Sequence, residues 1–223
     1  MEDNFSDFIL RTLYIFEGNY WQFKHVFQDF SQLSISDEYM FDERKSLDLY
    51  FQASQEISRL FHNYVSAWFS QKEHTSVIHK KLKKSEKSYL REFAIEYQER
   101  LDKSIKKSTE NIFINDLRRY IQHKAIPPLC KIMTLNNDGA SVSLCFDSDK
   151  IKDFDWKKES KEYILSRQNI HLDEIVDSHF CVVKKFHEWI YFRDLQLSPY
   201  NFTINKHMSF EEWLKSNEHL LNH

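Results

Sequence analysis

The sequence predicts an all-α fold, an antiparallel helical bundle with one short inserted β-hairpin. The 223 residues include only 2 glycines and 3 prolines, which leaves few positions for tight turns. Apolar side chains recur every three or four residues through several long stretches, which is the period of an amphipathic helix. Two short alternating runs instead flank Asp138-Gly139, a pair typical of a hairpin turn. We therefore expect a single helical domain over 1–223, with its core bundle over roughly 41–195.

The first forty residues predict two helices and a loop. Aromatic and aliphatic residues at helical spacing indicate one helix over 3–17 and a second, shorter one that ends near residue 30. We expect Gly18 to separate them, because glycine is a poor helix former. The N-terminal helices would thus occupy 3–30, and the serine-rich, acidic stretch 31–40 would form a loop.

The middle of the chain predicts two long helices. A strong apolar stripe indicates the first over 43–70. The stretch 71–85 is basic and loses this pattern, so we expect a connection there. A second stripe over 89–123 indicates one helix of roughly 35 residues, about 50 Å long at 1.5 Å per residue. Pro127 ends it, because the residue before a proline disfavours the helical region.

The pattern changes after the prolines. Residues 129–147 predict the β-hairpin, with its turn at Asp138-Gly139. Asp155 is suited to accept hydrogen bonds at the start of a helix over 156–168.

The C-terminal part predicts two further helices. Apolar spacing indicates a major helix over 171–195, followed by an irregular stretch over 196–207. Ser209 and Glu212 have the spacing of a capping box, which predicts a short helix over 209–221.

Composition limits the class of protein. At 41% hydrophobic residues the chain can bury one substantial core, and its 19 Phe, 11 Tyr and 5 Trp would supply much of it. The net charge of −3 excludes a globally basic nucleic-acid binder, while a local basic patch remains compatible with it. No apolar run approaches the roughly 18 to 20 residues that span a bilayer. We therefore expect a soluble protein with no membrane association.

The cysteines favour a reduced, cytoplasmic setting. Cys130 and Cys145 would lie nearly opposite each other in the hairpin, so a disulfide is geometrically possible. The acidic first residues, however, lack the basic region of a secretory signal, so we expect reduced thiols. Neither the cysteines nor the histidines have a metal-binding spacing, no glycine-rich phosphate loop occurs, and we expect no metal or cofactor.

One short segment carries the most chemistry. Leu117-Arg118-Arg119-Tyr120-Ile121-Gln122-His123 ends the long helical pattern and is followed by Pro127. Arginine binds phosphate and histidine moves protons near neutral pH. On a regular helix Arg119 lies roughly 40° from His123, whereas Arg118 lies roughly 140° away. Arg119 is thus the same-face neighbour of His123.

This segment resembles the signature of HEPN-domain proteins. That signature is an arginine, four to six residues and a histidine, near the end of a long helix in an all-α bundle. A bacterial variant reads Arg-Asn-Tyr-x-Gln-His with a proline shortly after, and Arg118 to His123 matches it except at Arg119. The motif itself covers 117–128.

The resemblance implies a metal-independent endoribonuclease that acts as a homodimer, with the two motifs lining one cleft. His123 would be the general acid or base and Arg118 would hold the scissile phosphate, leaving a 2′,3′-cyclic phosphate and a 5′-hydroxyl. Arg119, Gln122 and Lys124 would be further RNA contacts. Such proteins serve in bacterial toxin or antiphage defence systems, so an antitoxin or a defence-system protein is a further expected partner.

An alternative function is a non-catalytic HEPN-like binding module of a toxin–antitoxin or defence complex. Many family members carry Asn, Asp or His where this chain has Arg119, and many lack activity. Taken alone, Arg118 and Arg119 are also compatible with surface ion pairs, for which Asp116 stands beside them. His123 is compatible with a helix-terminal hydrogen bond, and His179 with core packing.

Overall fold

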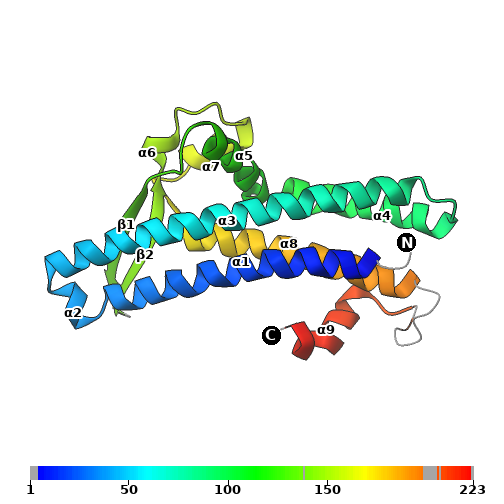
Figure 1. Cartoon of the computed structure of the whole chain (residues 1–223), viewed down its shortest axis with the longest axis horizontal. Helices are drawn as coiled ribbons and strands as arrows, with labels where there is room; N and C mark the ends of the chain where they lie inside the picture. Colours follow the sequence, from blue (N-terminus) through cyan, green and yellow to red (C-terminus); the bar gives the residue numbers. More distant parts are fainter. Residues whose placement is uncertain (1–4, 138, 198–204, 206, 222–223) are drawn as a thin grey trace.

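Long helices set the shape of the molecule (Figure 1). The computed structural model describes residues 5–137, 139–197, 205 and 207–221. Helix α1 (Phe5–Ser34) and helix α3 (Glu43–Lys83) run antiparallel, joined by the short α2 (Asp37–Met40). Helix α8 (Leu172–Leu197) packs along α1, so these three helices form an elongated layer that follows the long axis of the molecule.

The remaining helices attach to this layer. Helix α4 (Ser88–Lys103) folds back along α3, and a 3-10 turn η1 (Ile105–Lys107) leads into α5 (Thr109–His123). Helix α5 packs on α7 (Lys158–Leu165), and Figure 1 shows both above α3. Helix α9 (Phe210–Leu221) packs near the end of α8.

A small antiparallel sheet completes the fold. Strands β1 (Leu129–Asn136) and β2 (Gly139–Asp147) form the predicted hairpin over 129–147, and β3 (Asn169–His171) adds to β2. Cys130 lies opposite Cys145 in the register, and both are free thiols. The sequence did not indicate β3, which follows the short α6 (Ser148–Ile151) and α7. The mostly helical architecture with an inserted hairpin is confirmed.

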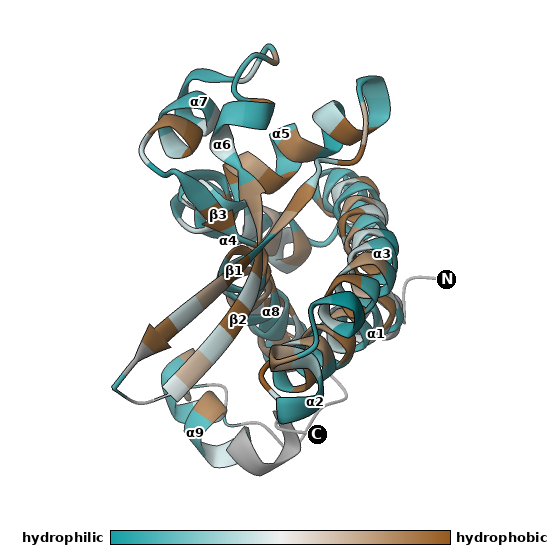
Figure 2. Ribbon diagram, turned by 90° about the vertical axis from the view of Figure 1, so that its left-hand side faces the viewer, coloured by the Kyte–Doolittle hydropathy of each residue, from teal (hydrophilic) through white to brown (hydrophobic). Residues whose placement is uncertain are grey.

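Aromatic side chains pack the interface of the long helices. The rings of Tyr20 and Phe180 stack with centroids 3.6 Å apart, and Phe16 lies 5.1 Å from Tyr64. Figure 2 shows the apolar residues on the inner sides of the helices and on the strands.

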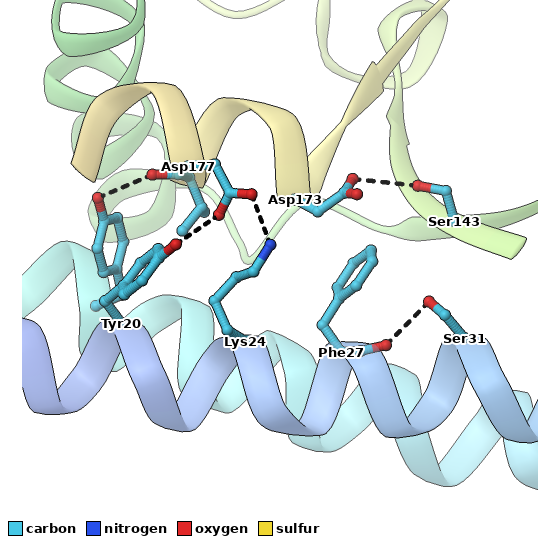
Figure 3. Close-up of polar contacts among 9 residues, drawn as sticks. Tyr20, Lys24, Phe27, Ser31, Ser143, Asp173 and Asp177 are labelled. Carbon is cyan, nitrogen blue, oxygen red and sulfur yellow. Dashed lines mark hydrogen bonds and ion pairs between the residues drawn. The ribbon is translucent and has the colours of Figure 1, made fainter. Parts of the chain in front are cut away.

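A polar clamp joins α1 to α8 at the edge of this core (Figure 3). Asp177 accepts hydrogen bonds from the Tyr20 hydroxyl at 3.0 Å and from Lys24 Nζ at 2.6 Å. Asp173, one turn earlier on α8, accepts a hydrogen bond from Ser143 of β2 at 3.3 Å.

Gly18 does not interrupt the first helix. Helix α1 is continuous from Phe5 to Ser34, so the two-helix prediction over 3–30 is wrong, and so is the loop expected over 31–40, which contains the end of α1 and α2. An interior glycine costs a helix only about 1 kcal/mol relative to alanine. The aromatic residues that α1 buries on both sides of Gly18 outweigh this cost.

The basic stretch 71–85 is not a connection, because α3 continues to Lys83. Gln71, Thr75, His79 and Leu82 carry its buried face onward with side chains that a purely apolar pattern misses. Lys80, Lys81 and Lys83 occupy its last turn, where cations are favoured by the exposed carbonyl groups of the helix end.

The helix expected over 89–123 is broken between Lys103 and Thr109. The Ser108 hydroxyl accepts a hydrogen bond from Asn111 N at 3.2 Å, and the buried Asn111 amide donates to Ile105 O at 2.8 Å. These side-chain hydrogen bonds offer the backbone an alternative to helix continuation.

Other predicted boundaries have mixed outcomes. Asp155 does not cap a helix over 156–168, because α7 begins only at Lys158, and the Asp155 carbonyl instead accepts a hydrogen bond from Arg119. Helix 171–195 is confirmed as α8. Of the irregular stretch predicted over 196–207, residues 198–204 and 206 lie outside the described part of the chain.

The predicted C-terminal helix is confirmed as α9. Its capping box is formed by Glu212 N donating to the Ser209 hydroxyl at 3.2 Å and Ser209 N donating to the Glu212 carboxylate at 2.8 Å. Across the described residues, the helices are too short or too polar to cross a membrane.

Candidate functional site

Helix α5 positions the Arg118–His123 segment. It begins at the Ser108 cap, remains α-helical to His123 and ends at Lys124, three residues before Pro127. Because the last turn stays regular, Arg118 and Arg119 leave the helix in different directions.

Arg118 points toward α3. Its guanidinium lies over the Phe69 ring at 3.9 Å from the centroid, a cation–π contact. It lines a hollow of about 380 Å³ between the two helices, which we call the α3–α5 hollow. The other polar side chains lining this hollow are His62, Ser66, Ser70, Glu73, His74 and Gln122.

Arg119 has different surroundings. Its guanidinium pairs with the buried Asp116 carboxylate at 3.5 Å, donates to the Asp155 carbonyl and lies 5.3 Å from the Phe154 ring centroid. It thus ties α5 to the segment before α7. Its expected role as an RNA contact stays a prediction, and these contacts favour a structural role.

His123 is exposed at the end of α5 and is not among the residues lining the hollow. Gln122 lines the hollow, and Lys124 lies 5.4 Å above the Tyr120 ring. A single chain therefore brings Arg118 and Gln122 to one hollow and leaves His123 beside it.

Positive charge gathers around Phe69. Lys72 Nζ lies 4.9 Å from its ring centroid and donates to Asn115 Oδ1 at 3.0 Å. Burial lowers the pKa of Lys72, and the nearby charges of Lys157 and Arg118 lower it further, against an opposing effect of Glu73. Within the described residues, no carboxylate lies within ion-pair distance of Arg118.

Several residues at this site were not indicated by the sequence. Phe69, His62 and His74 come from α3, which is about fifty residues away along the chain. Since His62 and His74 are twelve residues apart on a helix, roughly 18 Å along its axis, one phosphate cannot contact both. The signal that could have found them is the row of polar residues three or four apart on α3.

The site also shows what chemistry its side chains can perform. Arg118 can hold an anion, and the hydroxyl, amide and imidazole groups around it can donate hydrogen bonds. In the part of the chain that the structure describes, His, Cys, Asp and Glu form no cluster of three or more that could hold a metal ion. Comparison with protein-family models, curated proteins and solved structures gave no match for this chain.

Proposed function

We propose that this chain is a metal-independent endoribonuclease of the HEPN type. The observation that carries the proposal is the set of groups that surround the Arg118 guanidinium. It lines a hollow with hydrogen-bonding side chains, and among the described residues no carboxylate lies within ion-pair distance of it, although Glu73 lines the same hollow. An arginine so placed is suited to bind a phosphate through two parallel hydrogen bonds.

The proposed reaction is transfer within one phosphodiester. The ribose 2′-hydroxyl attacks the adjacent phosphorus, the bond from phosphorus to the 5′-oxygen breaks, and a 2′,3′-cyclic phosphate and a 5′-hydroxyl form. One group accepts the 2′-hydroxyl proton and another delivers a proton to the leaving oxygen. Arg118 holds the phosphate, and its charge offsets the negative charge that builds up on it.

A homodimer supplies the two proton-transfer groups. His123 is exposed at the end of α5 and lies outside the hollow of its own chain. Pairing of two copies through the ends of α5 would place two His123 side chains near the phosphates that the two Arg118 side chains hold. One imidazole then acts as base and the other as acid. A cytoplasmic role in bacterial toxin or antiphage defence belongs to the same proposal.

The test is RNA cleavage by the purified full chain in the presence of EDTA. We expect fragments with 2′,3′-cyclic phosphate ends, identified by mass spectrometry. His123→Ala should lower the rate about 10²- to 10⁴-fold, the usual contribution of a general acid or base. Arg118→Ala should also abolish most of the cleavage, with the helical content and oligomeric state unchanged.

Matched controls are available on the same chain. His25 and Arg44 are exposed on α1 and α3, away from the hollow, so His25→Ala and Arg44→Ala should cleave at the wild-type rate. Cleavage that survives both His123→Ala and Arg118→Ala would contradict the proposal.

A non-catalytic binding module is the second candidate. It is favoured because one chain does not bring the two motif residues together: Arg118 packs on Phe69 in the hollow, while His123 lies outside the hollow. A folded protein that binds RNA or a partner protein but yields no cyclic-phosphate ends would support this function instead.

A further inference from the structure

Exposed apolar side chains follow the outer side of α1. This helix packs on α3 and α8 through its other side. On the outer side Tyr14 is 78% exposed and Ile15 is 59% exposed, and Leu10, Trp21 and Leu33 are the other large apolar residues exposed there. Single exposed apolar residues are normal, but these five lie within about 140° of the helix circumference. Such a surface is typical of a protein–protein contact, and we call it the outer face of α1.

Gly18 lies in the middle of this face, about 40° around the helix from Tyr14 and about 60° from Ile15. Its φ is not positive, and among the described residues nothing beyond its own helix backbone and chain neighbours lies within 4 Å of where a Cβ would stand. Neither conformation nor packing within the chain therefore requires glycine, although alanine would favour the helix. The missing side chain lets an outside group approach α1 closely.

The charges of the outer face allow it to pair with itself. Arg11 and Asp29 are both exposed and lie eighteen residues apart, which is five full turns, so they leave α1 in the same direction. A two-fold rotation that reverses the helix at the level of Tyr20 brings Arg11 of one copy opposite Asp29 of the other, twice. Arg11 also interacts within its own chain, and its guanidinium has five N–H groups to share between partners. Opposite charges at both ends favour this register.

We propose that the outer face of α1 binds a second copy of this chain, with the two α1 helices antiparallel. Trp21 of each copy then lies beside Gly18 of the other, about 1.5 Å away along the helix axis, where the missing side chain leaves room for the indole ring. Tyr14 of each copy lies near His25 of the other. The exposed apolar side chains are removed from water in the same step, which drives the association.

This contact is distinct from the pairing through the ends of α5. Figure 1 shows α1 and α5 on opposite sides of α3, so neither pairing occupies the surface that the other needs. The proposal therefore does not rest on the ribonuclease activity. Variants that lose the α1 contact should keep only the α5 pairing and sediment as dimers, or as monomers if that pairing does not form.

Sedimentation equilibrium of the purified full chain tests the contact. The wild type should self-associate, and Ile15→Gln should weaken the association at least tenfold, because a two-fold contact loses the side chain from both copies. Ile95→Gln is the matched control: Ile95 is 60% exposed on α4, and its removal should change nothing. Gly18→Gln should also weaken the association without loss of helical content, since glutamine is the better helix former. A wild type that does not self-associate, or an Ile15→Gln variant that associates like the wild type, would overturn the proposal.

Charge reversal tests the register. Arg11→Asp and Asp29→Arg each place like charges opposite one another between identical copies, so each variant alone should associate at least tenfold more weakly at low salt. An equimolar mixture of the two variants forms two attractive pairs and should recover most of the wild-type affinity. Both positions are exposed, so the fold should survive. A mixture that associates no better than the separate variants would overturn the antiparallel contact and leave the face to a different protein.

Discussion

Arg118 and Arg119 are neighbours in sequence with opposite surroundings. Arg118 lies on an aromatic ring at the edge of a hollow, while Arg119 compensates Asp116, whose side chain is only 2% exposed. Asp116 also accepts a hydrogen bond from Lys157 N at 2.7 Å, so removal of Arg119 takes away its charged partner and leaves this one hydrogen bond against the cost of burying the carboxylate. The two arginines should therefore differ in what their removal changes.

We predict that Arg119→Gln destabilises the fold more than Arg118→Gln does. Loss of the Arg119 contacts to Asp116 and Asp155 should lower the free energy of unfolding by about 1 to 3 kcal/mol, the cost of leaving buried polar groups without a partner. Arg118→Gln should cost less, about 0.5 to 1 kcal/mol, the range for a cation–π contact that is partly exposed. Urea denaturation followed by circular dichroism measures both, and equal destabilisation would contradict this division of roles.

At the level of elements, local hydrogen bonds decide where helices begin and end. The break before α5 depends on Ser108 and Asn111, and it turns α5 away from the direction of α4 (Figure 1). A straight helix over 89–123 would instead carry Arg118 away from Phe69 on α3. The cap of α5 thus helps to position the candidate site.

Ser108→Ala should therefore lower the free energy of unfolding by about 1 kcal/mol, the typical effect of losing a serine N-cap. The measurement is the midpoint of urea denaturation, which should fall while the m value, the slope of unfolding free energy against urea concentration, stays unchanged. Ser54→Ala is the control: Ser54 is half-buried within α3, and within the described part of the chain its hydroxyl donates only to the Phe51 carbonyl. Because alanine is the better helix former, Ser54→Ala should be neutral or slightly stabilising. A Ser108→Ala variant as stable as the wild type would show that the cap contributes nothing.

For the whole molecule, α8 makes stability sensitive to acid. His179 and His187 are fully enclosed on this helix, and burial lowers the pKa of His179 to about 3 and that of His187 to about 4. His179 Nδ1 shares a hydrogen bond with the Tyr64 hydroxyl at 2.6 Å, which links α8 to α3. Both imidazoles are neutral in the folded protein at neutral pH.

Stability should fall as the pH is lowered from about 6.5 toward 4. In this window the unfolded chain, whose histidines titrate near about 6.5, binds protons that the folded chain does not. Each such histidine contributes a slope of up to about 1.4 kcal/mol per pH unit. His187→Gln should show a shallower pH dependence of the unfolding free energy than the wild type. His25→Gln, at an exposed position, should not, and identical slopes in all three proteins would contradict the prediction.

Apolar periodicity and turn chemistry were sufficient for the helical class, the hairpin, α8 and α9. These features depend on contacts between residues close in the chain, so the sequence records them directly. The sequence also singled out the Arg118–His123 segment, because arginine, histidine and a terminating proline stand within twelve residues.

Only the tertiary structure decided the rest. Packing of α1 against α3 and α8 overrode Gly18, and the polar buried face of α3 extended that helix through the lysine run. The roles of the two arginines depend on partners from distant segments: Phe69 for Arg118, and Asp155 for Arg119. Helix geometry had made Arg119 the same-face neighbour of His123, but packing engages Arg119 elsewhere and turns Arg118 to the hollow. Such pairings arise from long-range contacts, which residue spacing along one helix cannot encode.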